Sequence, residues 1–414
     1  MTNFCLICKK QSERDSSFCL EHQKYETKFN AIREINKDFS GVSPPAIFIG
    51  SKLTYPKVNV GILTPIENTE NPANFNNPNE WVANNYDIKR ISALRTGLIN
   101  SRFKADVFQA RNQGRLLELS QEIAMSMKPA NVEIHLEKKP TIRKVYFEDT
   151  SLPVGPAAEL KHATLIENVK ISNKVQKVVY DTDLKAIDGL RYLNDKGFDE
   201  NQLQQLLSVG VLGLGKNRKL VPTKHSITAV DSNLGEDLIL NVKHYEKIYD
   251  YKLFYGNYFG NYYLVLMFPE IWGYELFETF IANKLADKNE ELNYTTDYES
   301  YKKRTTYADQ CAGGYYANRF SVLNYLQAEK KQARVICYRF TTEEYEVPLG
   351  VWVVRQGVKK TMSNECLVFE SKEKLMDKAR EIVLLKFNYN LDNMFAKTKL
   401  LAEMKKQNKL SNYF

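Results

Sequence analysis

The chain has 414 residues, which is enough for two or three domains with a buried core. Hydrophobic residues make up 43% and charged residues 26%, as in ordinary soluble globular proteins. No apolar run reaches the roughly 18 residues that a membrane span requires, and no signal peptide begins at Met1, so we expect a cytoplasmic protein. The net charge of +8 favours a polyanionic partner only if the basic residues gather in one place.

Four candidate metal ligands open the chain, in two pairs whose members are separated by two residues: Cys5, Cys8, Cys19 and His22. Each pair can form a tight knuckle on a tetrahedral ion, and four sulfur and nitrogen ligands without a carboxylate favour structural zinc. The alternative is a chance group of cysteines in a loop. Three basic residues between the pairs are candidate DNA contacts, although solvation is their commoner role: Lys9, Lys10 and Arg14.

The stretch before residue 130 is predicted to contain a helix, two strands, a loop and a helical region, over residues 25–38, 43–50, 55–61, 67–80 and 86–127. The helical region carries several arginines, among them Arg95 and Arg111. An arginine on a helix is more often solvated or salt-bridged than functional. Because a guanidinium group suits bidentate phosphate contacts, both remain candidates for binding an anionic ligand.

Residues 131–180 alternate between polar and apolar side chains, which predicts strands at Val132–Glu137 and Lys174–Val179. Two helices are predicted to follow, over residues 183–196 and 199–209.

The segment Gly210–Asp231 is the most distinctive internal stretch. Three glycines and the basic residues Arg218, Lys219 and Lys224 precede a run that resembles a strand and carries Ser226. Glycines let backbone N–H groups approach an anion closely, so the basic residues are candidate DNA contacts. The segment matches neither a phosphate-binding loop nor a dinucleotide fingerprint, and a flexible basic turn before a half-buried strand is an equal alternative.

Residues 245–268 are dense in Tyr and Phe and contain two Gly-Asn turn signals, which predicts a pair of antiparallel strands. Aromatic strands can stack bases, but packing in the core is the expected role. A helix is predicted over residues 272–285. The polar residues 287–304 are predicted to separate two large domains.

The second large domain is predicted to contain a helix, two strands, a further helix and a helical spacer, at about residues 320–331, 333–341, 348–355, 372–385 and 392–406.

The last eight residues, Gln407–Phe414, read as glutamine, an aliphatic residue and two aromatics at fixed spacing. A single helical turn would project Leu410, Tyr413 and Phe414 from one side, so the segment can dock as a helix in a groove. The pattern resembles the peptide by which proteins bind the replication sliding clamp (PCNA). That resemblance implies that the apolar side chains fill a pocket and that the Gln407 amide hydrogen-bonds beside it. A frayed terminus is the alternative.

Several internal motifs together resemble the archaeal Nre-type DNA repair proteins: Ser43-Pro44-Pro45, Tyr55-Pro56-Lys57-Val58, Arg218 to Asp231, Gly313-Gly314-Tyr315-Tyr316-Ala317, and Pro348-Leu349-Gly350-Val351-Trp352. The resemblance extends from about Pro44 to Arg355, and the zinc knuckle and clamp-binding tail belong to the same family picture. It implies a role in DNA repair connected with the sliding clamp and with nucleotide excision repair proteins. It supplies no catalytic residues.

We therefore expect an α+β protein with two mixed α/β domains, a small zinc knuckle before them and a flexible tail after them. The predicted limits are residues 1–28 for the knuckle, 29–286 and 300–390 for the two domains, and 391–414 for the spacer and tail.

The leading hypothesis is a DNA-binding repair factor that is tethered to the sliding clamp and associates with the chromosome in the cytoplasm. The alternative is an enzyme acting on nucleic acid or a nucleotide-like ligand, in a polar pocket built from Arg95, Arg111, Ser226, Asp231 and Tyr315. The chain shows no clustered carboxylates or histidines of the kind that a metal-dependent nuclease uses, so catalysis stays undecided. A third hypothesis, a scaffold between clamp and repair enzymes, predicts weak and salt-insensitive DNA binding.

Overall fold

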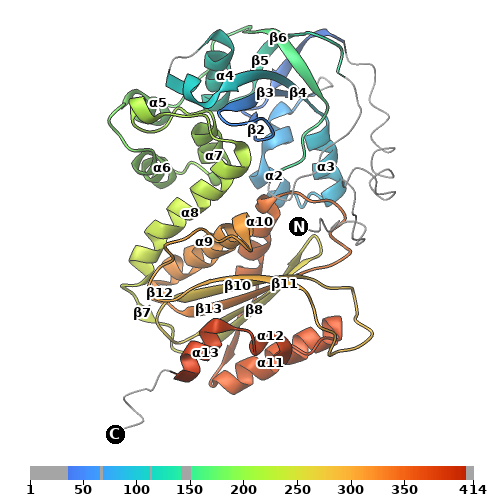
Figure 1. Cartoon of the computed structure of the whole chain (residues 1–414), viewed down its shortest axis with the longest axis vertical. Coiled ribbons are helices and arrows are strands. Elements are labelled where there is room, and N and C mark those ends of the chain that lie inside the picture. The colour runs from blue at the N-terminus through green and yellow to red at the C-terminus, as the bar shows by residue number, and fades with distance from the viewer. Residues whose placement is uncertain (1–35, 66–68, 112–113, 141–150, 407–414) are drawn as a thin grey trace. The chain divides into compact units, whose positions relative to one another are not determined.

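The computed structural model of the chain describes residues 36–65, 69–111, 114–140 and 151–406 (Figure 1). Contacts divide the chain into two compact units. Unit 1 comprises Met1–Val230 with Val347–Gly350, and unit 2 comprises Asp231–Glu346 with Val351–Phe414. The boundary falls inside helix α8 (Thr223–Val242). Each unit combines a six-stranded sheet with helices, so the predicted α+β class is confirmed for the described residues. The segments predicted to form a zinc knuckle and a clamp-binding tail lie outside them.

The sheet of unit 1 has the strand order β1-β5-β6-β4-β3-β2. Its strands are β1 (Asp38–Ser43), β2 (Ile47–Gly50), β3 (Lys57–Pro65), β4 (Leu98–Asp106), β5 (Ala130–Leu136) and β6 (Ala157–Leu165). Neighbouring strands are antiparallel except β4 and β6, which run parallel. In β3 the alternate residues Val58, Val60 and Ile62 are buried, because successive side chains of a strand point to opposite faces.

The helices of unit 1 are α2 (Pro78–Ala83), α3 (Ile88–Thr96), α4 (Arg115–Met125), α5 (Asn173–Tyr180), α6 (Ala186–Asp195), α7 (Glu200–Ser208) and the first part of α8. The described part of unit 1 also contains the short 3-10 helices η2 (Pro72–Asn76), η3 (Val107–Arg111) and η4 (Gly215–Asn217). Local chemistry sets several of the boundaries. Asp87 accepts a hydrogen bond from the Arg90 N–H at the start of α3, and Asp199 with Gln202 forms a capping box on α7.

The sheet of unit 2 has the strand order β11-β10-β13-β9-β8-β14. Its strands are β8 (Tyr251–Tyr258), β9 (Asn261–Phe268), β10 (Gly273–Phe280), β11 (Tyr294–Glu299), β13 (Arg334–Thr341) and β14 (Leu367–Phe369), and a separate pair joins β7 (Glu246–Lys247) to β12 (Lys331–Gln332). Helices α9 (Ala312–Glu329) and α10 (Val351–Met362) lie on one face of the sheet (Figure 1). Helices α11 (Lys372–Phe387), α12 (Asp392–Phe395) and α13 (Lys399–Lys406) lie on the other face.

The core of unit 2 lies between the sheet and α11. Leu264 and Leu266 of β9 and Tyr338 of β13 share one buried cluster with Val383 and Phe387 of α11. Burying one such side chain contributes about 1.5–3 kcal/mol, so this layer is a main source of the stability of unit 2. None of the helices within the described residues is long and apolar enough to cross a membrane.

Several predicted elements are confirmed within a few residues of their predicted limits. They are the strand β5, the helices α6 and α7, the antiparallel pair β8 and β9, the strand β13 and the helix α11. Each has a clear local period or turn signal. The β8–β9 hairpin, for example, turns at Phe259 and Gly260, which both have positive φ. Helix α9 ends close to its predicted limit but begins at Ala312, before its predicted start after Arg319.

Two predicted strands are wrong, because Lys174–Val179 forms α5 and Pro348–Arg355 leads into α10. Both segments are rich in valine, which favours strands when no other contact decides. In α5 the Ser172 hydroxyl accepts from the Lys174 N–H, and Val175 and Val178 are buried at a spacing of three. The spacing of buried residues is therefore helical even though the composition is typical of a strand.

The predicted strand after Lys224 is also wrong, because Thr223–Val242 is one continuous helix. The run around Ile227 alternates polar and apolar residues over too few positions to distinguish the two periods. Over the longer span Ile227, Val230 and Leu234 are buried at spacings of three and four, which is the helical period.

The helix predicted over residues 272–285 is wrong, because Gly273–Phe280 is the strand β10. This strand is buried on both faces, so the alternation that identifies a half-exposed strand is missing. Glu275 and Glu278 have the spacing of a helix face. Their partners lie on different elements, since Glu275 accepts from the N–H groups of Lys399 and Leu400 and Glu278 pairs with Arg339.

The predicted helical region over residues 86–127 is correct for α3 and α4 but misses the strand β4 between them. The apolar spacing from Ile91 to Leu98 continues through Gly97, where the helix ends. Residues 287–304, predicted to be a polar boundary, include β11, which pairs with β10 in the same sheet. The loop predicted over residues 67–80 contains η2 and the start of α2.

Candidate functional site

The five residues proposed for a ligand pocket are divided between the two units. Arg95, Arg111 and Ser226 belong to unit 1, whereas Asp231 and Tyr315 belong to unit 2. Each of the five side chains has contacts within its own unit.

Arg95 is held inside unit 1 by hydrogen bonds to uncharged oxygens. Its Nε donates to the Pro153 carbonyl at 3.1 Å, and its Nη1 donates to the Phe75 carbonyl at 3.2 Å and to Asn76 Oδ1 at 2.8 Å. The residue is 4% exposed, and burial lowers the pKa of its guanidinium group to about 10. The Ser226 hydroxyl donates to the Thr223 carbonyl at 2.9 Å within α8. These contacts account for both side chains without a ligand.

Asp231 forms a buried ion pair with Arg355. Arg355 Nη2 lies 2.7 Å from both carboxylate oxygens of Asp231, and Nε lies 3.1 Å from Oδ1. The carboxylate is therefore engaged in joining α8 to α10. A buried pair of this kind serves the fold, because removing either partner leaves an uncompensated charge.

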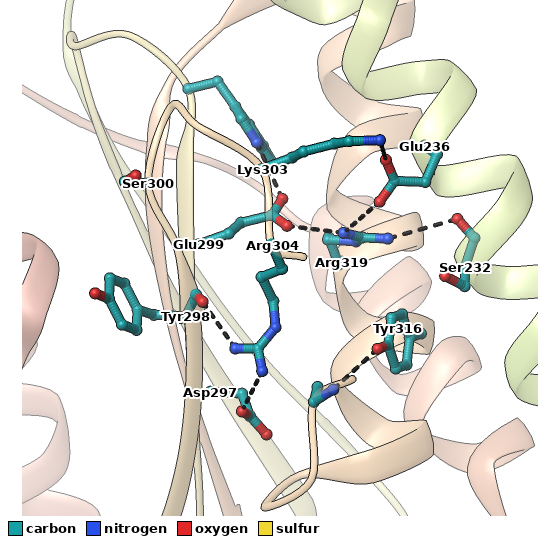
Figure 2. A network of polar contacts seen from close by, with 12 residues as sticks. Ser232, Glu236, Asp297, Tyr298, Glu299, Ser300, Lys303, Arg304, Tyr316 and Arg319 are labelled. Carbon is teal, nitrogen blue, oxygen red and sulfur yellow. Dashed lines mark hydrogen bonds and ion pairs between the residues drawn. The ribbon is translucent and has the colours of Figure 1, made fainter. Parts of the chain in front are cut away.

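Tyr315 lies beside a network of paired charges. The network joins α8, β11 and α9 (Figure 2). We call Glu236, Asp297, Glu299, Arg304 and Arg319 the Arg319 network. Arg319 Nη1 lies 2.8 Å from Glu299 Oε2 and 3.3 Å from Glu236 Oε1. The Trp272 indole N–H donates to the other oxygen of Glu299 at 3.1 Å.

The second half of the Arg319 network fixes the start of α9. Arg304 Nη2 lies 3.0 Å from Asp297 Oδ1 (Figure 2). Asp297 Oδ2 accepts from the backbone N–H groups of Gln310 and Cys311. The guanidinium carbons of Arg304 and Arg319 lie 5.3 and 5.6 Å from the centre of the Tyr315 ring. Each of these charges has an opposite partner, so the network resembles a structural brace more than a ligand site.

Two basic residues of unit 1, Arg111 and Lys219, meet at the exposed ring of Phe108. Three segments meet there: the turn before β3, the helix η3 and the chain after η4. The Val107 N–H donates to the Pro56 carbonyl at 3.0 Å, and the Leu220 N–H donates to the Val107 carbonyl at 2.8 Å. We call Tyr55, Phe108, Arg111, Arg218 and Lys219 the Phe108 cluster.

Two exposed cations contact the Phe108 ring. The Arg111 guanidinium carbon lies 5.1 Å and the Lys219 ammonium nitrogen 5.0 Å from the ring centre, within the range of cation–π contacts. Arg111 Nε also donates to the Arg218 carbonyl at 3.2 Å. Among the described residues, no carboxylate forms an ion pair with Arg111 or Lys219. Both charges are therefore available to an anionic ligand.

Arg218 has a different environment from Lys219, although the two are adjacent. Its Nε donates to the Gly213 carbonyl at 2.9 Å and its Nη2 to the Val179 carbonyl at 2.6 Å. Burial lowers the pKa of this guanidinium group. Arg218 thus secures the chain after η4, which we call the basic segment (Arg218 and Lys219), whereas Lys219 presents its charge to solvent.

Gly210 allows the basic segment to lie against η3. Its φ is +70°, and a Cβ atom there would lie 2.7 Å from the Lys219 carbonyl oxygen and 2.8 Å from Ala110 Cβ. Only glycine adopts this backbone conformation readily and leaves that space free. The glycines are predicted to let the backbone approach an anion. At Gly210 the close approach is instead to the backbone of Lys219.

The exposed face of β3 and β4 extends from the Phe108 cluster. Lys57 of β3 and Lys104 and Arg102 of β4 are exposed, and residues paired across antiparallel strands share a face. Two carboxylates reduce this charge. Glu159 of β6 lies opposite Arg102 in the register of β4 and β6, and Asp106 accepts the Phe108 N–H at 2.8 Å.

The remaining candidate residues are placed as follows. Lys224 is partly exposed in the first turn of α8, where burial and then the Lys224 charge lower the pKa of His225. The predicted metal ligands, the basic residues between them and the predicted clamp-binding residues lie outside the described residues. Within the described part of the chain, no group of three or more His, Cys, Asp or Glu side chains is arranged to hold a metal ion.

Comparison with known proteins identifies the family. Residues 15–285 match the family model of the archaeal Nre N-terminal region, and residues 299–413 match that of the C-terminal region. The chain belongs to the archaeal Nre family. This confirms the resemblance that the internal motifs indicate.

Three curated relatives are similar to this Nre chain over most of its length. DNA repair protein NreA of Haloferax volcanii is 33% identical over 362 residues, which are 86% of each chain. DNA repair protein NreA of Archaeoglobus fulgidus is 36% identical over 89% of this chain and 90% of its own. DNA repair protein NreB of the same organism is 32% identical over 82% and 84%. No solved structure matches the chain.

Sequence reasoning identifies Arg111, Arg218 and Lys219 but misses Tyr55 and Phe108. Phe108 lies in η3, directly after β4, in a region predicted to be helical, so nothing local marks its exposure. Tyr55 precedes Pro56 in one of the motifs that resemble the family. A residue before proline favours a turn, and this was the signal that could have predicted an exposed Tyr55 ring.

Proposed function

We propose that this Nre protein is a DNA repair factor that binds DNA through unit 1 and is tethered to the sliding clamp by its tail. The names of its relatives support a role in DNA repair. The resemblance of the internal motifs and the tail connects this role with the clamp and with nucleotide excision repair of damaged DNA.

The Phe108 cluster carries the proposal that unit 1 binds DNA. Arg111 and Lys219 come from segments far apart in the sequence, yet both contact one ring and expose their charges. Phosphate groups of nucleic acid are the anions that such cations bind, and Lys104 and Arg102 continue the positive charge along the neighbouring sheet face.

The test is the salt dependence of DNA binding by the full chain. Replacing both Arg111 and Lys219 by Ala should weaken binding and make the plot of log affinity against log salt shallower, by about 0.9 for each lost duplex phosphate contact. The matched control replaces Lys374 and Lys378 of α11, which pair with Glu370 and Glu381, and so removes the same formal charge. Equal slopes in the wild type and the double variant of the cluster would refute this DNA surface.

The tail is proposed to dock in the groove of the sliding clamp. Tyr413 and Phe414 supply most of its apolar area, and burying two rings of roughly 150 Å² or more offers several kcal/mol before the ordering of the chain is subtracted. We expect about micromolar affinity for the isolated peptide. Calorimetry with the cognate clamp tests this. A peptide with Tyr413→Ala and Phe414→Ala should show no binding, whereas Gln407→Ala should retain part of it, because one hydrogen bond contributes only about 0.5–1.5 kcal/mol.

The first segment is proposed to hold one structural zinc ion on Cys5, Cys8, Cys19 and His22. The paired spacing supports this, because it suits a closed tetrahedral site. Metal analysis of the purified chain should find about one zinc per chain. Less than about half an equivalent, with no gain on reconstitution, would exclude the site.

A further inference from the structure

Tyr55 differs from the other aromatic residue of the Phe108 cluster in how much of its ring is open. Its exposed fraction is 68%, against 37% for Phe108. The two rings meet edge to face, with centres 6.3 Å apart and planes at 79°. Phe108 is already in contact with Arg111 and Lys219, whereas most of the Tyr55 ring faces solvent.

The backbone around Tyr55 is held in place. The Lys57 N–H donates to the Thr54 carbonyl at 3.0 Å and closes a turn around the residue. The Val107 N–H donates to the Pro56 carbonyl at 3.0 Å and attaches the turn to η3. A large ring that is exposed on an anchored turn loses little conformational freedom when it binds a ligand.

An exposed aromatic ring beside unpaired cations matches the chemistry of a strand of unpaired nucleotides. Every base has a flat face that can stack on an aromatic side chain, and every nucleotide carries a phosphate for a neighbouring cation. In a duplex the bases are stacked on one another, so their faces are closed to a side chain. A duplex can therefore contact only the cations of the cluster, through its phosphates.

We infer that the Phe108 cluster binds single-stranded DNA, with one unpaired base stacked on Tyr55 and the adjoining phosphates on Arg111 and Lys219. Phe108 braces the Tyr55 ring and holds the two cations beside it. This inference rests on the proposed function and deepens it, because it names the DNA structure that the basic surface prefers.

The experiment compares single-stranded oligo-dT with a duplex of equal length, by fluorescence anisotropy on the full chain. Tyr55→Ala should weaken binding of the single strand roughly 5- to 150-fold, the effect of losing one stacked base, and leave duplex binding unchanged. Tyr55→Phe should retain wild-type affinity, because the ring and not the hydroxyl makes the contact.

The matched control is Tyr249→Ala in unit 2. Tyr249 is 77% exposed, but its ring lies under Lys331 and its hydroxyl donates to Glu246. Removing it should leave both affinities unchanged. A second readout uses Tyr55→Trp, whose added fluorescence should be quenched by oligo-dT, since the three native tryptophans are buried.

The outcomes separate this inference from the proposed function. If Tyr55→Ala binds the single strand as well as the wild type, or if it weakens duplex binding equally, the stacking site is wrong. In both cases the proposed function stands as long as Arg111→Ala with Lys219→Ala weakens binding. If that double variant binds both DNAs like the wild type, the proposed DNA surface itself fails.

Discussion

The Phe108 cluster of unit 1 and the Arg319 network of unit 2 use the same chemical groups in opposite ways. In each, an arginine lies over an aromatic ring: Arg111 over Phe108, and Arg319 over Tyr315 and Tyr316. Arg319 is 1% exposed and pairs with Glu299 and Glu236, whereas Arg111 is exposed and meets no described carboxylate. A cation on an aromatic ring is therefore not by itself a sign of a ligand site. Exposure and unmatched charge make the distinction.

The physical reason is the cost of moving a charge out of water. A buried guanidinium group must have a partner in the fold, and that partner then excludes a ligand. An exposed guanidinium group keeps its hydration and can exchange water for a phosphate at little cost. The comparison predicts that substitutions in the Arg319 network mainly lower stability, whereas substitutions of the exposed cations in the Phe108 cluster mainly weaken DNA binding.

The largest expected effect is on stability, from Arg319→Ala. The change leaves Glu299 buried without its cation, which should lower the free energy of unfolding of unit 2 by about 3–5 kcal/mol. Urea unfolding followed by circular dichroism measures it. Arg111→Ala is the matched control in unit 1, and its effect should stay within about 0.5 kcal/mol. Similar losses from the two variants would remove the distinction between the regions.

Gly210→Ala should lower both the stability of unit 1 and its affinity for DNA. The positive φ and the close contact with the Lys219 carbonyl predict a loss of about 1–3 kcal/mol, together with weaker DNA binding as the basic segment shifts. Gly114→Ala is the control, since a Cβ atom there has nothing within 4 Å. Stability and binding are measured on the same samples. Wild-type DNA affinity in a clearly destabilised Gly210 variant would show that the position of Lys219 is unimportant.

A buried carboxylate without a direct cation extends the comparison to pH. Glu275 accepts from the N–H groups of Lys399 and Leu400 at the start of α13, and burial raises its pKa to about 7. Between its ordinary pKa of about 4.3 and this value, the folded state retains a proton that the unfolded state releases.

Stability should therefore fall as pH rises from about 4.5 to 7, with a contribution from Glu275 of up to about 1.4 kcal/mol per pH unit. Glu275→Gln should lack this contribution. Unfolding midpoints of the wild type and the variant across the pH range give the difference in slope. Parallel curves would mean that Glu275 is ionised throughout.

The smallest expected effects separate two neighbours in the basic segment. Arg218→Ala loses hydrogen bonds to the Gly213 and Val179 carbonyls and should lower stability by about 1–2 kcal/mol. Lys219→Ala should leave stability unchanged and make the salt dependence of duplex binding shallower by about 0.9. Thermal melting and a salt series on both variants provide the comparison. The reverse assignment would show that Arg218, not Lys219, contacts DNA.

The sequence alone determined the family and the elements whose signals are local. The hairpin of β8 and β9 has its turn residues, α7 has its capping box, and α11 has its helical period, so each could be predicted without knowing its neighbours. The basic residues Arg218 and Lys219 were likewise visible as a cluster in the chain.

The tertiary structure decided what depends on distant partners. Strand β10 and helix α10 are misread from sequence, because burial on several sides removes the polar–apolar alternation that identifies a period. The site has the same property. Arg111 lies three residues from Phe108 in η3, but Lys219 reaches the ring because the fold brings its segment against η3, where Arg111 donates to the carbonyl of Arg218, 107 residues away. Charge can be read residue by residue, but whether a charge is matched or exposed depends on which segments the fold brings beside it.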